Sequence, residues 1–119
     1  MRKLALPLLL LVVLGACSSP TDEPAREWIR FLKAQQQRVE TGTFDKDAFM
    51  REGMEIADRL NAHRNATEGR PLATKKVLKQ WQEANTNFEN ACRQARHAEA
   101  LVAYREVGDY MMEGWTPPP

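Results

Sequence analysis

Residues 77–102, VLKQWQEANTNFENACRQARHAEALV, carry the strongest structural signal in this sequence. Apolar and small residues recur there at alternating spacings of four and three, which is the heptad pattern of packed helices. The seam positions are Val77, Trp81, Ala84, Phe88, Ala91, Ala95, Ala98 and Val102. Alanine on such a seam lets a neighbouring helix approach closely, while large aromatic side chains fill the gaps. We therefore expect one long helix over residues 73–112, about 60 Å long at 1.5 Å per residue.

Two shorter helices are predicted upstream of this seam. The first shows one apolar helical face, formed by Trp28, Phe31, Leu32, Gln35 and Val39, and it stops at the Thr-Gly-Thr of residues 41–43. The second begins near Asp45 and presents Phe49, Gly53, Ile56, Leu60 and His63 on one face. Residues 61–71 contain Asn, Thr, Gly and Pro and are expected to form a loop. The predicted fold is all-α: an elongated three-helix hairpin in which the two shorter helices pack antiparallel along the long C-terminal one.

Charged pairs four residues apart are expected on the solvent-facing sides of these helices, where they add modest support. The pairs are Glu55 with Arg59, Lys79 with Glu83, Glu89 with Arg93, and Arg105 with Asp109.

A second apolar stripe lies on the last turns of the predicted long helix, offset from the seam. It consists of Leu101, Tyr104, Gly108 and Met111, with Met112 and Trp115 nearby. The favoured interpretation is that the first helix, rich in aromatic and branched residues, packs on this stripe. The alternative is a partner surface, since exposed apolar stripes on small domains often mark one, and Leu101, Tyr104, Met111 and Trp115 are the residues expected to form it. The Thr-Pro-Pro-Pro of residues 116–119 is expected to leave the helix as an extended tail.

The N-terminus begins with Arg2-Lys3, continues with the apolar run of residues 4–14, and reaches Leu14-Gly15-Ala16-Cys17. A charged start, a short apolar segment and small residues predict a secretory signal, since a bilayer-spanning helix needs about 20 apolar residues. Leu-Gly-Ala-Cys resembles the lipobox of bacterial lipoproteins. The resemblance implies a signal peptide over residues 1–16, cleavage between Ala16 and Cys17, and a covalent lipid on Cys17. A secretory signal cut after Ala16 without lipid attachment is the alternative.

Membrane anchoring follows from the same resemblance, because two or three acyl chains hold a protein firmly where one does not. In Gram-negative members of the class, aspartate after the cysteine favours the inner membrane. This chain has Ser18 there, which by resemblance implies the outer membrane, on its periplasmic face. Residues 17–24 are expected to be the lipidated cysteine and a flexible tether. Residues 25–115 form the predicted helical domain, which resembles no family that we recognise.

Composition narrows the functional classes. The chain has 17 basic and 16 acidic residues and a net charge of +1, and without Arg2 and Lys3 the balance becomes about −1. Neither a nucleic-acid-binding domain nor a polybasic membrane surface is indicated. With Cys17 lipidated, Cys92 is the only other cysteine, so no intrachain disulfide is expected and helix packing must stabilise the domain.

No motif indicates catalysis or a metal centre. The candidate ligands are His63, His97, Cys92 and the methionine pairs Met50/Met54 and Met111/Met112, but neither His-Glu-x-x-His nor paired Cys-x-x-Cys spacing occurs. Methionines at helical spacing are usually core residues. Cys92 lies in an alanine-rich stretch and is expected to be a buried apolar residue, with a nucleophilic cysteine or a disulfide to a partner as alternatives. We expect no enzyme activity, no metal and no cofactor besides the lipid.

The sequence therefore predicts a lipid-anchored helical adaptor of an envelope assembly of the secretion, pilus or conjugation type. It would bind a protein partner and no nucleic acid. Self-association into a homo-oligomer is left open. The first alternative is a tethered immunity protein or inhibitor of a periplasmic toxin or hydrolase. The second is a metal- or stress-sensing helical module that uses His63, His97 and the methionines.

Overall fold

The computed structural model describes residues 22–66 and 73–114, and these residues form four helices and no strand. The helices are α2 (Asp22–Thr41), α3 (Lys46–Ala66), α4 (Lys75–Gln94) and α5 (Ala98–Glu113). The all-α prediction is confirmed. The three-helix prediction is wrong, because the expected long helix is two helices joined by a tight turn. The predicted signal peptide, Cys17 and the predicted extended tail lie outside the described residues.

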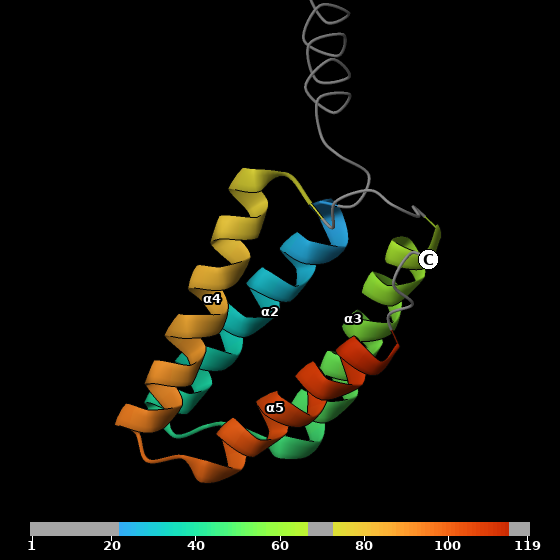
Figure 1. The fold of residues 1–119 in the computed structure, drawn as a ribbon. Helices are drawn as coiled ribbons and strands as arrows, with labels where there is room; N and C mark the ends of the chain where they lie inside the picture. Colours follow the sequence, from blue (N-terminus) through green and yellow to red (C-terminus); the bar gives the residue numbers. More distant parts are fainter. Residues whose placement is uncertain (1–21, 67–72, 115–119) are drawn as a thin grey trace, which may run out of the picture.

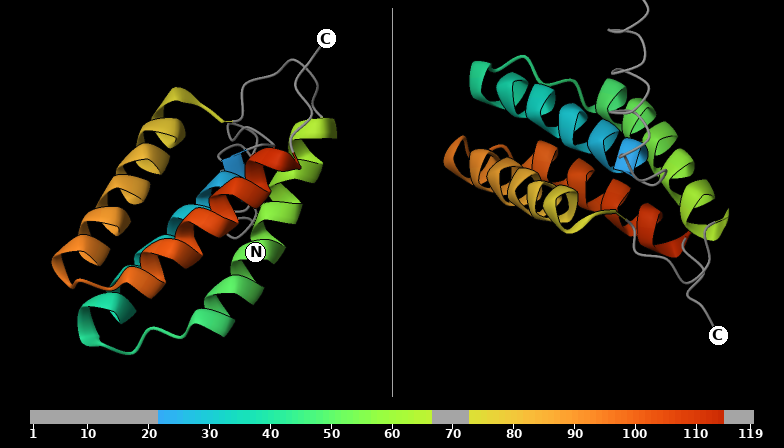
Figure 2. Two further views of the ribbon diagram at one scale, coloured as in Figure 1. Left: turned by 60° about the horizontal axis from the view of Figure 1, so that its bottom comes forward. Right: turned by 90° about the horizontal axis from the view of Figure 1, so that it is seen from above.

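Two helical hairpins stack face to face, as Figure 2 shows in its right-hand view. One layer is α2 with α3, and the other is α4 with α5 (Figure 1). The largest contacts join the layers: α2 packs on α4, and α3 packs on α5. In each of these pairs the helices run in the same direction, and both hairpin turns lie at the same end of the molecule. Each helix therefore buries its apolar face mainly against the other hairpin.

A continuous chain of aromatic rings joins the four helices at the centre of the core. Trp81 of α4 contacts Trp28 of α2 with ring centroids 6.0 Å apart. From α2 the chain continues through Phe31, Phe49, Phe88 and Tyr104, with successive centroids 5.0 to 5.7 Å apart. Offset aromatic contacts of this kind add about 0.5–1.5 kcal/mol each beyond the buried area. The rings predicted on separate helical faces thus converge in one core.

The turn between α4 and α5 is where the predicted long helix breaks. Arg96 has φ 52°, in the left-handed region. The backbone N–H of His97 donates to the carbonyl of Cys92 at 2.8 Å, and that of Arg96 to Arg93 at 3.1 Å. These two bonds form a Schellman motif, which ends a helix. Helix α2 ends in the same motif before the turn to α3, with Gly42 at φ 74° in the corresponding position.

The break changes which residues face the core. Val77, Ala84, Phe88 and Ala91 of the predicted seam are buried, and Trp81 is half-buried. Beyond the turn the predicted seam fails: Ala95, Ala98 and Val102 are exposed. The buried residues of α5 are instead Ala100, Ala103, Val107 and Met111. The turn therefore changes which positions of the following helix face the core.

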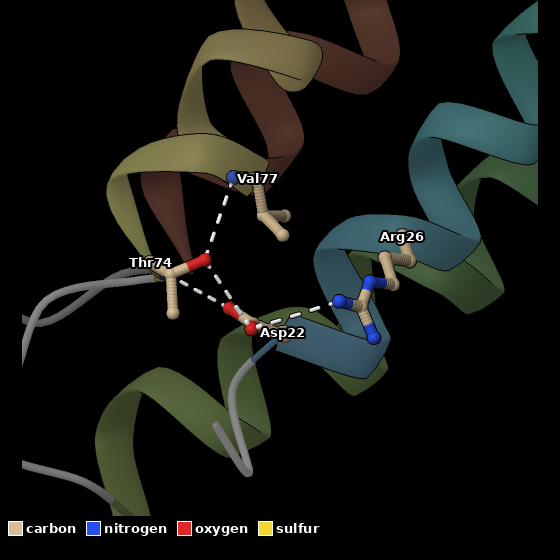
Figure 3. Close-up of polar contacts among 4 residues, drawn as sticks. All are labelled: Asp22, Arg26, Thr74 and Val77. Atoms are coloured by element: carbon tan, nitrogen blue, oxygen red, sulfur yellow. Dashed lines mark hydrogen bonds and ion pairs between the residues drawn. The ribbon is translucent and has the colours of Figure 1, made fainter. Parts of the chain in front are cut away.

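The N-termini of α2 and α4 are joined by a buried carboxylate (Figure 3). Asp22 is 2% exposed and accepts a hydrogen bond of 2.8 Å from the backbone N–H of Thr74. Thr74 is the N-cap of α4, and its hydroxyl accepts from the backbone N–H of Val77. Arg26, one turn along α2, lies 4.0 Å from the second carboxylate oxygen. Because Asp22 is the first residue of α2, residues 22–24 belong to the helical domain and not to the predicted tether.

Of the four predicted charged pairs, one forms an ion pair as expected, and the other three do not form one within the described residues. Glu89 and Arg93 form the expected ion pair at 3.4 Å. Arg59 instead reaches across to Glu27 of α2 at 2.8 Å, so it joins the two helices of a hairpin. The second predicted helix also extends further than expected, because Asn61 is buried within α3 and the helix continues to Ala66.

Candidate interaction surface

The predicted partner stripe is divided by the fold. Met111 is 4% exposed and belongs to the core, so it is not part of a free surface. Leu101 and Tyr104 are half-buried and pack against that core. Trp115 lies outside the described residues. The helix that packs most extensively on α5 is α3, not the first helix that the favoured interpretation expected.

Tyr104 packs against residues of the core. Its ring contacts Phe88 of α4 with centroids 5.2 Å apart. Burial, followed by the charge and hydrogen bond of the Glu89 carboxylate, raises the pKa of Tyr104 to about 12. The phenol therefore stays neutral at physiological pH, and its ring closes the end of the aromatic chain.

The large exposed apolar side chains among the described residues all lie on α5: Val102 is 48% exposed, Tyr110 39% and Met112 57%. The Tyr110 hydroxyl donates a hydrogen bond to Asp58 of α3, which fixes that ring at the edge of the face. Val102 and Met112 remain open to a partner.

Four carboxylates follow the same outward side of α5. Glu99, Glu106, Asp109 and Glu113 lie three, four, seven and eleven residues from Val102, and these spacings place all of them on one side of a helix. All four are exposed. Within residues 22–66 and 73–114, none of them forms an ion pair, and the predicted pair of Arg105 with Asp109 is not formed. We call Val102, Met112 and these four acids the α5 outer face.

This arrangement of charge opposes the stability of the helix that carries it. Like charges three or four residues apart, such as Asp109 and Glu113, destabilise a helix by about 0.2–0.5 kcal/mol per pair. The last turn of α5 contains no basic residue, although the C-terminal end of a helix dipole favours cations. Charge placements that lower the stability of their own helix in this way often occur at functional surfaces.

Cys92 is unsuited to nucleophilic chemistry. It is 1% exposed, as expected for a core residue. Burial, with a contribution from the Glu89 charge, raises the pKa of its thiol from 9.0 to about 11. Since the thiolate is the reactive form, this cysteine is inert at neutral pH.

The other residues considered as metal ligands contact neighbouring side chains or backbone. His97 is the N-cap of α5, where its Nδ1 accepts from the backbone N–H of Ala100 at 3.1 Å. Its ring contacts Phe44, with centroids 5.1 Å apart, and so joins the two hairpin turns. Met50 and Met54 are half-buried against the core. In the part of the chain that the structure describes, no three His, Cys, Asp or Glu residues are grouped to hold a metal.

The sequence contained the signal for the α5 outer face, but it was divided between two patterns. Val102 continues the heptad seam and Met112 lies near the second stripe, and of the four acids only Asp109 enters a predicted pair, with Arg105. Read alone, residues 98–113 have one apolar face containing Ala100, Ala103, Val107 and Met111, and an acidic face opposite it.

No family model matches the chain, and no curated protein or solved structure matches it either. Among the described helices, none combines the length and the apolar character that crossing a bilayer requires.

Proposed function

We propose that this chain is a non-catalytic, lipid-anchored adaptor of an envelope assembly, held on the periplasmic face of the outer membrane through Cys17. The α5 outer face is the observation that carries the proposal. Its exposed apolar side chains lie among carboxylates that have no ion-pair partner in residues 22–66 and 73–114, and exposed apolar surface can mark a partner site. The inert environment of Cys92 and the capping role of His97 support an adaptor over an enzyme or a metal sensor.

Its mechanism is local concentration. Four residues separate Cys17 from Asp22, and an extended chain spans at most about 3.3–3.6 Å per residue. The lipid would therefore hold the first turn of α2 within roughly 20 Å of the membrane surface. A partner bound to the domain is then confined to the same layer, which raises its effective concentration there.

The anchoring step is tested by growing cells that express the full chain with radiolabelled palmitate. We expect the wild-type protein to carry the label and to fractionate with the membranes, and we expect Cys17→Ser to lose both properties. A wild-type protein without label, or a Cys17→Ser variant that fractionates unchanged, contradicts the anchor.

The adaptor role is tested by affinity purification of the full chain from its native envelope, with Cys17→Ser in parallel. A stoichiometric component of a membrane machine, retained by the wild type, supports the proposal. A secreted toxin or a hydrolase as the bound protein would instead identify the chain as an immunity protein or inhibitor. No bound protein under either condition contradicts the adaptor role.

A further inference from the structure

We infer that the α5 outer face binds an amphipathic helix of a partner protein that carries lysine or arginine beside its apolar residues. This inference rests on the proposed adaptor function and specifies the chemistry of its partner. The size of the face suits such a helix: Glu99 and Glu113 are separated by fourteen positions, or about 21 Å at 1.5 Å per residue. That length presents about four turns to a helix lying alongside.

The apolar component comes from two exposed side chains: Val102 lies within the acidic stripe, and Met112 lies at its edge, ten residues further along α5. Val102 and Met112 are about half exposed, and Leu101, next to Val102 in the sequence, is half-buried. Helices that dock on such surfaces use apolar residues at spacings of three, four and seven. Methionine adapts its shape to the side chains that cover it.

Charge selects a basic partner. The outer side of α5 carries four carboxylates and one base, Arg105, and the carboxylates have no ion-pair partner within the described residues. Lysine or arginine on an approaching helix would relieve the repulsion between Glu106, Asp109 and Glu113. The same carboxylates repel nucleic acids and anionic lipid headgroups.

A second copy of this chain fits the face less well. One exposed basic cluster is Lys75, Lys76 and Lys79 on the first turns of α4. Its apolar neighbours, Leu78 and Trp81, pack against the core and leave little apolar surface to cover Val102 and Met112. A second basic row on α2 is already engaged, because Arg26 and Arg30 pair with Asp22 and Glu23. A partner that supplies both is therefore favoured over self-association.

The test is fluorescence anisotropy with the full chain in a neutral detergent. The probes are two fluorescein-labelled 18-residue peptides with the same leucine face, one with lysine and the other with glutamate on its polar face. The variant is Glu106→Gln, Asp109→Asn and Glu113→Gln combined. Its matched control removes three exposed acids elsewhere, by Glu40→Gln, Glu52→Gln and Glu83→Gln. Circular dichroism checks that both variants keep the wild-type helicity, and detergent without protein gives the background.

We expect saturable binding of the lysine peptide, weakened about tenfold by the α5 variant and less than twofold by the control. Val102→Ser with Met112→Gln, which keeps every charge, should weaken binding several-fold. Added salt should weaken it further. Equal binding of the glutamate peptide, equal loss in both triple variants, or no binding would overturn the inference. So would a concentration-dependent dimer, measured by sedimentation, that the α5 variant abolishes.

This measurement does not use the anchor. Its failure removes the basic helix as the partner and leaves Cys17 lipidation and co-purification as separate tests of the adaptor function. Failure of palmitate labelling removes the anchor without affecting the peptide binding.

Discussion

Arg96 occupies a backbone conformation that glycine adopts more easily. Its φ of 52° matches the 74° of Gly42, which ends α2 in the same motif. A non-glycine residue in this region costs about 1 kcal/mol or more, although glycine loses more entropy on folding. The structure therefore contains one favourable and one unfavourable helix end at equivalent places.

Replacing these two residues should change stability in opposite directions. We expect Arg96→Gly to raise the free energy of unfolding by about 0.5–1 kcal/mol, and Gly42→Ala to lower it by about 1 kcal/mol. Urea denaturation followed by circular dichroism measures both. A destabilised Arg96→Gly variant would show that the arginine side chain makes a contribution that outweighs the backbone conformation.

The buried thiol of Cys92 should make the protein sensitive to alkali. Its pKa is about 11 in the fold against 9.0 ordinarily, so the unfolded chain loses the proton first as the pH rises. The contribution of this thiol to the free energy of unfolding is complete below pH 9. It falls as the pH rises from 9 to 11, by up to about 3 kcal/mol. We expect denaturation midpoints to fall over this interval and Cys92→Ala to flatten the decrease. An equally steep decrease in the variant would assign the effect to other groups, such as Tyr104.

Periodicity predicted most of the helical content correctly, because apolar residues at helical spacing need a core wherever they occur. It failed at residues 95–97, which contain neither glycine nor proline. The seam also continued through Ala95 and Ala98, since alanine fits an exposed helical position as well as a buried one. An arginine in the left-handed region is not visible in a hydrophobic pattern. The number of helices was therefore decided by a backbone conformation that composition does not indicate.

Two helical glycines distinguish close packing from open space. A Cβ at Gly53 of α3 would lie 3.1 Å from the side chain of Val107 of α5, whereas a Cβ at Gly108 has nothing within 4 Å. We expect Gly108→Ala to stabilise the protein by about 0.5–1 kcal/mol through helix propensity. Gly53→Leu should destabilise it by about 1–3 kcal/mol by forcing α3 and α5 apart. Thermal unfolding of the two variants measures both. Similar melting temperatures would contradict the close approach of these helices.

The arrangement of two stacked hairpins makes the domain depend on both halves. Because α2 packs mainly on α4 and α3 mainly on α5, neither hairpin contains a core of its own. We expect the separate peptide 73–119 to show little helicity in water and to gain it when mixed with peptide 18–66. The intact chain should unfold in one transition, monitored by circular dichroism and tryptophan fluorescence together. A fully helical isolated peptide, or two separate transitions, would contradict this dependence.

The same arrangement explains why the candidate surface was harder to predict than the fold class. Which side of α5 is covered depends on the register of the second hairpin against the first. That register follows from the turn at Arg96, so Met111 became core and Val102 became surface. The prediction from the N-terminal motif depends on local residues and not on packing, and it stays a prediction because residues 1–21 lie outside the described part of the chain.

The bond between Asp22 and Thr74 also determines how the domain would respond to mechanical load. Tension that enters through residue 22 reaches a carboxylate that is held by the first turn of α4 as well as by α2. The two parallel helices would then share the load from their starts, and α2 could not peel away from its N-terminus without first detaching α4.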